Sequence, residues 1–246
     1  MREILYGRQP VRETLRAGRR QVFKLLLASG LKPTGIGAEI VSLAGRAQVP
    51  VQQVDRSNLE TLGNEAHHQG IAAEVSGYPY VELAAVLEAA RRAAMPPFML
   101  LLDHIQDPQN LGALLRTAEA VGIHGVVLPQ KRAVGVTPAA VRASAGAAEH
   151  MRVVQVSNLV QAMESLKADG LWLAGMEALP GAQLYTQADL RGPLGLVVGG
   201  EGQGLARLVR ERCDFVVRLP MFGQVASLNA AVAAGIALYE ARRQRG

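Results

Sequence analysis

Two stretches of this sequence place polar side chains inside otherwise apolar surroundings. Glu201 stands among glycines in GGEGQG, and Ser227 and Asn229 stand two residues apart in the run SLN. The apolar run before each stretch predicts a strand. GGEGQG is then the loop after the first strand, and SLN lies at the end of a glycine-containing loop after the second. Because ligands gather beyond the carboxyl ends of strands in α/β domains, the two loops predict one ligand pocket.

A third motif with polar side chains among apolar ones, NLGALLR, lies upstream. It contains Asn110 and Arg116, six residues apart on the first turns of a predicted helix. The two side chains do not overlie each other on that helix, but Asn110 can point back from its start while Arg116 reaches along it. A guanidinium is effectively always charged, and its planar fork suits a phosphate or a negative charge that develops on oxygen.

Each of these side chains also has an ordinary structural explanation. Asn110 could cap its helix while Arg116 lies on the surface. Ser227 and Asn229 could likewise be a helix-capping pair, and Glu201 could be a loop carboxylate at a helix N-terminus. Residue spacing alone leaves both the structural and the functional explanation of these side chains open.

The glycine-rich run excludes the two common nucleotide-binding loops. GGEGQG lacks the G-x-G-x-x-G spacing of a dinucleotide-binding loop, and no Gly-Lys-Ser/Thr of a Walker loop follows it. Glycines 199, 200, 202 and 204 instead allow a close approach of backbone to a ligand and positive φ angles.

Composition places the chain among soluble globular proteins. Its 246 residues are 49% hydrophobic and include only four Phe and one Trp, which predicts a core of Ala, Leu and Val. No apolar run reaches the length of a membrane span, and the first residues do not form a signal peptide. The single Cys213 excludes an internal disulfide and a cysteine-based zinc site, so we predict a cytoplasmic location and no metal.

Positive charge is concentrated at the amino end. Residues 1–46 hold nine Lys or Arg against three acidic residues, whereas the remaining chain holds 17 against 18. Such a cluster can attract the phosphate backbone of a nucleic acid without sequence preference, although a solvated face would have the same composition. The predicted nucleic-acid contacts are Arg8, Arg12, Arg19 and Arg20, together with His68 at the edge of this region.

The amino-terminal residues alternate short strands and helices. Helical spacing of Val11 and Leu15 before Gly18 predicts a short basic helix over 10–17. Ser57 is a candidate N-cap for another helix, with Glu60 three residues later. A helix at 33–45 and strands at 22–28, 49–54 and 71–75 complete a small α/β domain, followed by a linker at 77–80.

Strand and helix signals continue to alternate beyond the linker. The unbroken apolar run 98–102 is typical of a central parallel strand covered on both faces. Further strands are predicted at 126–128, 153–156, 171–174, 194–198 and 215–219, and helices at 81–94, 110–121, 137–147, 158–168 and 229–243, with a short one between the last two strands. This order predicts a mostly parallel sheet with helices on both sides.

Taken together, the three polar motifs resemble those of the SpoU (TrmH-like) class of the SPOUT RNA 2′-O-ribose methyltransferases. The resemblance extends to YGRQPVRETL at the start of the chain, HQGIAA at 68–73 and LYEARRQR at its end. Within the class it is closest to the bacterial enzymes that methylate a guanosine of 23S rRNA. One departure is the pair Ala230 and Ala231, where the class usually has Val-Ser after the asparagine.

The resemblance implies a fold that the residue pattern alone does not give. It implies an α/β protein with a small L30e-like RNA-binding domain over 1–76, a linker and leading helix over 77–95, and a SPOUT catalytic domain over 96–246. That catalytic domain would have a parallel sheet and a trefoil knot at its carboxyl end. Homodimers would form through the catalytic domain, beside helix 229–243.

The resemblance also implies an activity, a cofactor and a site. The chain would transfer a methyl group from S-adenosylmethionine to a ribose 2′-hydroxyl of 23S rRNA. The residues matched to catalysis are Asn110, Arg116, Glu201, Ser227 and Asn229, and those matched to the cofactor are Gly199, Gly200, Gly202, Leu219, Met221 and Leu228. Two alternatives stay open: methylation of a tRNA guanosine, and a non-catalytic RNA-binding protein of the same fold.

Overall fold

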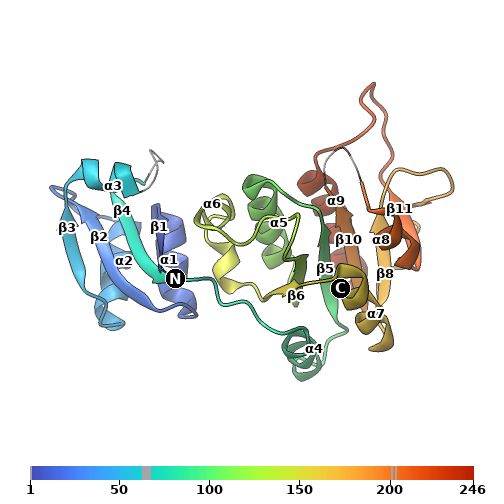
Figure 1. Ribbon diagram of the computed structural model, residues 1–246, viewed down its shortest axis with the longest axis horizontal. Coiled ribbons are helices and arrows are strands. Elements are labelled where there is room, and N and C mark those ends of the chain that lie inside the picture. Colours follow the sequence, from blue (N-terminus) through green and yellow to red (C-terminus); the bar gives the residue numbers. More distant parts are fainter. Residues whose placement is uncertain (1, 63–67, 201, 203) are drawn as a thin grey trace. The chain divides into compact units, whose positions relative to one another are not determined.

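The computed structural model describes residues 2–62, 68–200, 202 and 204–246 (Figure 1). The chain divides into two compact units: Met1–Pro79 with Val136–His150, and Tyr80–Gly135 with Met151–Gly246. The predicted domains, 1–76 and 96–246 with a linker and leading helix over 77–95, stay a prediction. In the structure the segment 136–150 is grouped with the compact amino-terminal unit.

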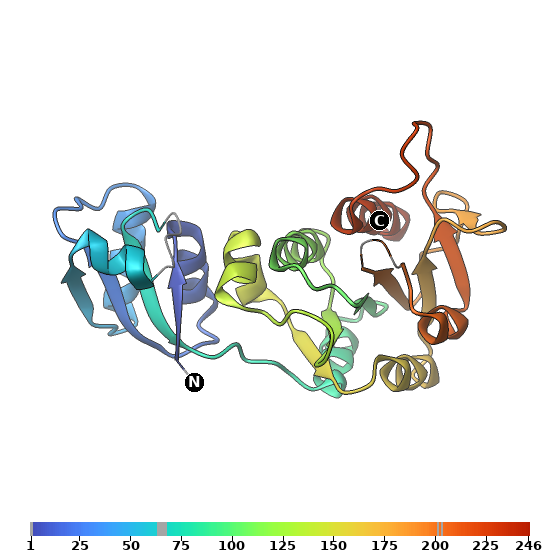
Figure 2. The ribbon, with the colours of Figure 1, turned by 45° about the horizontal axis from the view of Figure 1, so that its top comes forward.

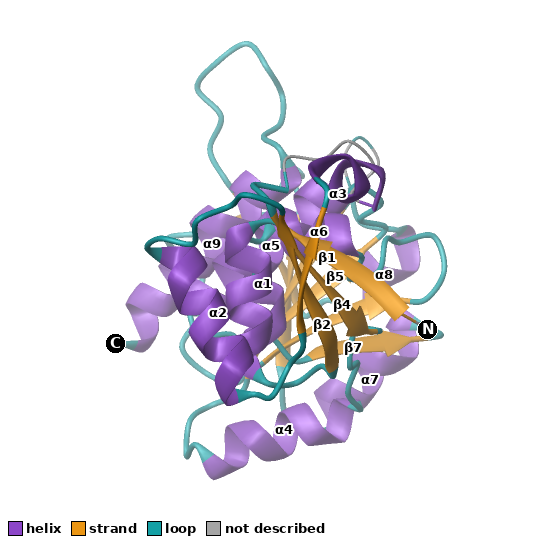
Figure 3. Ribbon diagram, turned by 90° about the vertical axis from the view of Figure 1, so that its left-hand side faces the viewer, coloured by secondary structure: helices purple, strands orange, loops and turns teal. Residues whose placement is uncertain are grey.

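The amino-terminal unit is built on a four-stranded sheet within the described residues. Its order is β1 (Arg2–Tyr6), β4 (Ile71–Ser76), β2 (Val22–Ala28) and β3 (Val51–Val54), with only the β2–β3 pair parallel. Helices α1 (Arg8–Ala17) and α2 (Ile36–Arg46) lie side by side in this unit (Figure 3), and α3 (Arg56–Leu62) contacts β2. Leu5, Leu25 and Ile40 are completely buried between these elements.

The segment that joins this unit from later in the chain is held by buried charge. Helix α6 (Pro138–Ala143) packs on β1, and the 3₁₀ turn η1 (Ala147–His150) packs on α1. The side chains of Arg20 and Glu149 are both completely buried and lie 3.0 Å apart. Arg20 also donates to Glu3 at 2.7 Å and to the carbonyl of Ser76 at 3.1 Å.

The second unit contains a sheet that is parallel throughout its described strands. Its order is β7 (Val153–Val156), β6 (Gly125–Pro129), β5 (Phe98–Asp103), β10 (Leu194–Gly199), β8 (Trp172–Met176), β11 (Phe215–Arg218) and β9 (Gln183–Leu184). Helices α5 (Pro108–Ala120) and α9 (Ala230–Arg245) cover one face (Figure 2). The other face carries α4 (Leu83–Arg92), α7 (Leu159–Ala168) and α8 (Arg207–Arg212).

Strand β10 is inserted between two strands that precede it in the chain. It pairs with β5 on one side and β8 on the other, and every residue from Leu194 to Gly199 is buried. Helix α9 then packs against both β10 and α5. The predicted parallel sheet is confirmed, whereas the predicted knot stays a prediction. In the described part of the chain, no helix is both long and apolar enough to cross a bilayer.

Most predicted elements are present, and the exceptions have local causes. Strands β1 and β9 were not predicted. Ser57 is not an N-cap, because α3 already begins at Arg56. The helix predicted over 137–147 is capped by Thr137 as expected but ends at Ala143. It ends there because Ala145 and Gly146 adopt φ angles of 52° and 88°, where the chain approaches α1 so closely that a Cβ on Gly146 would lie 2.7 Å from Cβ of Glu13.

We predict that replacing Arg20 destabilises the amino-terminal unit strongly. Arg20→Met leaves the Glu149 carboxylate buried without its cation, which costs about 3–5 kcal/mol. Arg16→Met is a matched control, because the Arg16–Glu39 ion pair is partly exposed and worth roughly 1 kcal/mol or less. Urea unfolding of the three chains measures the difference.

The loss of stability in the Arg20→Met variant should depend on pH in a defined direction. Burial raises the pKa of Glu149 above 4.5, and Arg20 opposes that rise. Without Arg20 the pKa rises further, so the destabilisation grows as pH increases through this range and is larger at about pH 8 than at about pH 5. A destabilisation that is equal at both pH values would contradict an ionised Glu149.

Candidate functional site

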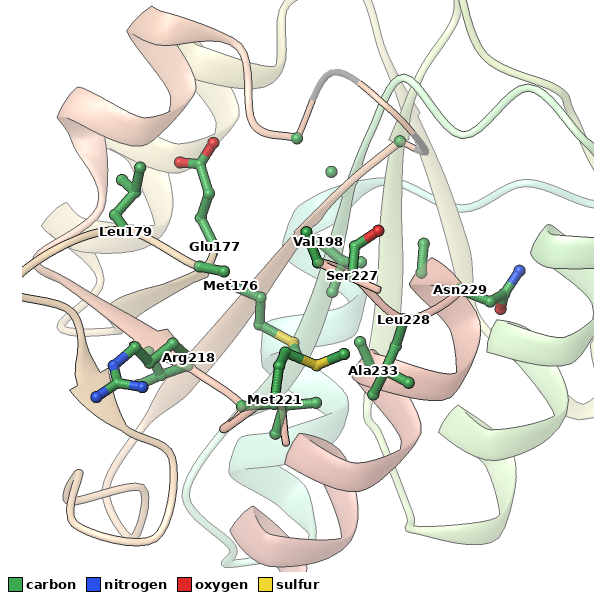
Figure 4. Close-up of a pocket in the computed structure, with 18 of the residues that line it drawn as sticks. Met176, Glu177, Leu179, Val198, Arg218, Met221, Ser227, Leu228, Asn229 and Ala233 are labelled. Atoms are coloured by element: carbon green, nitrogen blue, oxygen red, sulfur yellow. The ribbon is translucent and has the colours of Figure 1, made fainter. Parts of the chain in front are cut away.

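A cavity of about 630 Å³ opens at the carboxyl ends of strands β8, β10 and β11 (Figure 4). The strand ends contribute Met176, Val198 and Val217 to its wall, and the segment that leads into α9 closes another side. All six residues predicted to hold the cofactor line this cavity, as do two of the predicted catalytic residues: Gly199, Gly200, Gly202, Leu219, Met221, Leu228, Ser227 and Asn229. The two predicted loops therefore form one pocket.

The glycines that line this pocket are required by contacts within the chain. A Cβ on Gly199 would lie 2.2 Å from the carbonyl oxygen of Gly204, and one on Gly200 would lie 2.5 Å from the carbonyl oxygen of His104. Positive φ angles occur instead at Gly202 and Gly204, at 81° and 64°. Any side chain at 199 or 200 would therefore displace the loop that borders the cavity.

Asn229 performs two tasks at the mouth of helix α9. Its Oδ1 accepts hydrogen bonds from the backbone amides of Ala231 at 3.0 Å and Val232 at 3.2 Å, which makes it the N-cap of α9. Its Nδ2 donates to Oδ1 of Asn110 at 2.8 Å. Two motifs that are 119 residues apart in sequence thus meet side chain to side chain.

Asn110 is not the cap of its own helix. The N-cap of α5 is Asp107, whose carboxylate accepts from the amides of Gln109 at 3.2 Å and Asn110 at 3.1 Å. The capping explanation for Asn110 is therefore wrong. Because Asp107 fulfils that task, the Asn110 side chain is directed to Asn229 rather than to its own helix.

Asp103 holds the chain beside the cavity, a role that the sequence did not reveal. It is 2% exposed at the end of β5, and its Oδ2 accepts the backbone amide of Ala206 at 2.8 Å. Its Oδ1 contacts Nδ1 of His104, whose φ angle is 59°. The carboxylate thereby ties β5 to the chain that follows the glycine loop. The available signal was an acidic residue at the end of a completely apolar strand.

Arg116 lies on the exposed side of α5, beyond the first turn. No carboxylate in the described ranges lies within ion-pair distance of it. Glu201, predicted to stand beside it, lies outside the described residues. The charge of Arg116 is therefore presented to solvent on the helix that carries Asn110.

Glu177 and Arg218 add charge to the cavity wall, and neither was predicted. Glu177 follows β8, its side chain is 16% exposed, and its carboxylate lies 3.4 Å from Arg210. Arg218 ends β11 and donates from Nε to the carbonyl of Ala182 at 3.2 Å. Figure 4 places both on the side of the pocket away from Asn229. The cavity thus has charged groups at one end and the asparagine at the other.

Cys213 and the histidines do not form a reactive centre. Burial raises the pKa of the Cys213 thiol to about 12, so this thiol remains protonated and unreactive. Within the ranges that the structure describes, no three His, Cys, Asp or Glu side chains gather in a way that could hold a metal ion.

The predicted RNA-binding arginines are mostly engaged within the amino-terminal unit. Arg12 pairs with Glu13 at 2.7 Å and with Glu39 at 3.7 Å. Arg19 donates to the carbonyls of Glu149 and Pro79, each at 3.2 Å. These contacts neutralise or occupy charge that the sequence suggested was available to a nucleic acid.

Arg20 and His68 are buried in the same unit. The Arg20 side chain has no exposed surface and is bound by Glu3 and Glu149. His68 is 4% exposed, and its Nδ1 accepts the amide of Gly70 at 3.0 Å. Neither side chain is presented to RNA, so both leave the set of proposed RNA contacts. Arg8, described below, has a buried Nε without a hydrogen-bond partner and no carboxylate within ion-pair distance in the described part of the chain.

Two family models match this chain, one after the other along the sequence. Residues 97–239 match the SpoU rRNA Methylase family, and residues 4–81 match a domain described as RNA 2′-O ribose methyltransferase substrate binding. The protein YacO of Bacillus subtilis, which is named for the TrmH family of tRNA/rRNA methyltransferases, is 42% identical over 99% of this chain and 96% of its own length.

Solved structures share the fold. The SpoU methyltransferase AviRb from Streptomyces viridochromogenes, crystallised with AdoMet, has a TM-score of 0.81 and 27% identity, over 99% of this chain and 90% of AviRb. A TrmH/SpoU tRNA modifying enzyme of A. aeolicus has a TM-score of 0.56 and 26% identity, over 65% of this chain and 84% of its own.

We predict that the two tasks of Asn229 can be separated by substitution. Asn229→Ser keeps a capping oxygen but cannot reach Asn110, whereas Asn229→Ala loses both contacts. Loss of the cap costs about 0.5–2 kcal/mol, so the Ala variant should be less stable than the Ser variant by about 1 kcal/mol. Thermal unfolding of both variants tests this, and equal stability would mean that the cap contributes nothing measurable to α9.

Proposed function

Because the chain belongs to the SpoU rRNA methylase family, we propose that it transfers a methyl group from S-adenosylmethionine to the ribose 2′-hydroxyl of a guanosine in 23S rRNA. At the level of the family, it is an S-adenosylmethionine-dependent RNA 2′-O-methyltransferase of the TrmH/SpoU type, whose substrates are tRNA or rRNA. That the substrate is a guanosine of 23S rRNA goes beyond the family-level activity and is our proposal.

The observation that carries this proposal is the hydrogen bond between Asn110 and Asn229 beside the cavity. It joins the NLGALLR and SLN motifs at 2.8 Å, and Asn229 itself lines the pocket. A transfer reaction needs its two reactants held in line, and aligning them replaces what would otherwise be an entropic cost. The hydrogen bond between Asn110 and Asn229 fixes the starts of α5 and α9 against each other beside the cavity.

The cavity suits S-adenosylmethionine in shape and charge. Its apolar side chains, among them Met176, Val198 and Leu219, can cover an adenine ring, and its glycines permit main-chain contacts. The Glu177 carboxylate offers a partner for a cationic or hydroxyl group. When bound, the cofactor supplies an electrophilic methyl group on a sulfonium leaving group.

We assign Arg116 to the RNA side of the reaction. Its exposed guanidinium can hold a phosphate of the target nucleotide and stabilise the negative charge that develops on the 2′-oxygen. Since guanidinium stays protonated, the hydroxyl proton passes to water rather than to Arg116. Ser227 and the pair Asn110 and Asn229 line the transfer point, and Glu201 remains a proposed catalytic residue.

The amino-terminal unit favours rRNA over tRNA. Residues 4–81 match a substrate-binding domain, whereas the tRNA modifying enzyme of A. aeolicus aligns with only 65% of this chain. An enzyme that needs an additional RNA-binding unit is suited to a large folded substrate.

We also propose that the catalytic domain has the family's knotted topology. The insertion of β10 between β5 and β8, with α9 packed against α5, supports this topology.

We further propose a homodimer formed through helix α9. Val232, Ile236 and Tyr239 recur at helical spacing on its outer side and are 52%, 39% and 57% exposed. Its opposite side is buried against the unit, including Ala234, Ala237 and Leu238 at 0% exposure. An apolar stripe left uncovered on a long helix is typical of a subunit interface.

Methyl transfer to defined RNAs tests the function directly. The chain is incubated with tritiated S-adenosylmethionine and either undermethylated 23S rRNA or unmodified tRNA, and 2′-O-methyl sites are then mapped in RNA from a deletion strain. We expect incorporation into 23S rRNA at a guanosine. Incorporation into tRNA alone would overturn the substrate, and tight RNA binding without incorporation into either would overturn the transfer activity.

We predict graded losses of transfer for substitutions at Arg116. Arg116→Ala should lower kcat by about 10²–10³-fold, because it removes charge stabilisation that develops in the transition state. Arg116→Lys keeps the charge but loses the planar fork, so we expect a loss of about tenfold or more. Single-turnover kinetics measure both, and full activity of the Lys variant would contradict the bidentate role.

The α9 stripe predicts where a charge would separate the subunits. Ile236→Glu should shift the chain from dimer to monomer in analytical ultracentrifugation, since it buries an unpaired carboxylate in the proposed interface. Leu208→Glu is a matched control, because Leu208 is 53% exposed on α8, away from the stripe. A monomeric wild-type chain, or equal dissociation of both variants, would rule out this interface.

A further inference from the structure

The amino-terminal unit contains a second cavity, of about 390 Å³, which is lined by two arginines. It lies among the start of α1, the turn after β2, the first residue of α3 and the turn before β4. Its wall consists of Arg8, Ala28, Ser29, Gly30, Leu31, Arg56, Gln69 and Gly70. None of these described residues is acidic, so the lining has a net positive charge.

Arg8 carries an unsatisfied hydrogen-bond donor at this cavity. Its Nε is shielded from solvent and has no hydrogen-bond partner. Buried donors are nearly always paired, because an unpaired one keeps its desolvation cost without compensation. Arg12, Arg19 and Arg20, in contrast, are bound by carboxylates or carbonyls. Arg8 therefore lacks an acceptor that its neighbours already have.

The start of α1 is held against the turn before β4. Gln69 Oε1 accepts the amide of Arg8 at 3.4 Å, and the amide of Gly7 donates to the carbonyl of Ile71 at 3.0 Å. No acidic residue stands in the first turn of α1, so the positive charge of Arg8 is not neutralised there. On the opposite wall, His68 accepts the amide of Gly70 and so fixes the turn that carries Gln69.

Arg56 supplies the second cation. It is the first residue of α3, its side chain is 75% exposed, and its Nε lies 3.6 Å from Glu60. An exposed ion pair of this length contributes little free energy, so Arg56 can turn to a stronger acceptor at small cost. The two guanidinium groups approach the cavity from different elements, which suits an acceptor with several oxygens.

We propose that this cavity binds a phosphate group, and that in the RNA substrate the group is a phosphate of the backbone. The two guanidinium groups of the lining and the unsatisfied Nε of Arg8 favour an anion with several oxygens. The RNA source of that phosphate rests on the proposed function, whereas the anion site itself does not. Phosphate contacts would fix how the substrate lies on this unit without reading its sequence.

The test uses the full chain with paired substitutions. Arg8→Gln and Arg56→Gln are combined, and Arg46→Gln serves as the control. Arg46 is an exposed arginine at the end of α2, and it precedes β3 whereas Arg56 follows it. Binding of 23S rRNA is followed by fluorescence anisotropy at several salt concentrations, and binding of inorganic phosphate by calorimetry. Thermal unfolding and S-adenosylmethionine affinity confirm that the variants are folded.

We expect the double variant to lose about tenfold or more in RNA affinity and the control to lose much less. The slope of log affinity against log salt concentration should fall by about 0.7–0.9, which corresponds to one phosphate contact. Inorganic phosphate should bind the wild-type chain and compete with RNA, and it should do neither in the double variant.

The outcomes separate this inference from the proposed function. Equal RNA and phosphate affinities in the double variant and the Arg46 control would overturn the site, even if the wild-type chain methylates rRNA. Binding of inorganic phosphate that depends on Arg8, with RNA affinity unchanged by the substitutions, would overturn the RNA source and leave a site for a free anion. Absence of methyl transfer alone would count against the proposed function and not against this cavity.

Discussion

The functional half of the molecule depends on one side chain that serves two helices. Asn229 uses its oxygen to cap α9 and its nitrogen to hold Asn110 on α5. Because the cap amides fix the oxygen, the orientation of the whole carboxamide is fixed, and Asn110 must present its own oxygen in return. The start of each helix is thereby positioned against the other at the edge of the cavity. A serine or aspartate could cap α9, but only a carboxamide can also donate to Asn110.

Close backbone contacts then determine where the pocket can lie. Gly199 and Gly200 press against the carbonyl groups of Gly204 and His104, and Asp103 holds the amide of Ala206 beyond the loop. These contacts use main-chain groups, so they place the loop without filling the cavity with side chains. The loop at the strand end is therefore held by main-chain contacts. That arrangement follows from placing β10 between β5 and β8, since three adjacent parallel strands then end at one edge.

Local signals in the sequence predicted elements well, but they did not predict partners. The run 98–102 and the cap at Thr137 depend on neighbouring residues only, and both are present as expected. Residue spacing left open whether Asn110 caps its helix, and the structure gives that task to Asp107. The glycine loop that borders the cavity was located through its motif, whereas Asp103 and Glu177 acquire their positions from residues far away in the chain. No residue pattern at 136–150 indicates that its partners lie near residue 20.

The sequence also does not reveal which charged side chains have partners. This changes the number of arginines that are available to bind RNA. The count of arginines at the amino end suggested a broad basic surface, but Arg20 serves to bury Glu149 and Arg12 serves to hold Glu39 and Glu13. Charges bound in this way contribute less to the field outside the protein, because each cation stands beside an anion. Attraction of RNA to this unit should therefore depend on the few cations without a close acid. Among them, Arg8 is distinguished by a donor that has neither solvent nor protein to satisfy it.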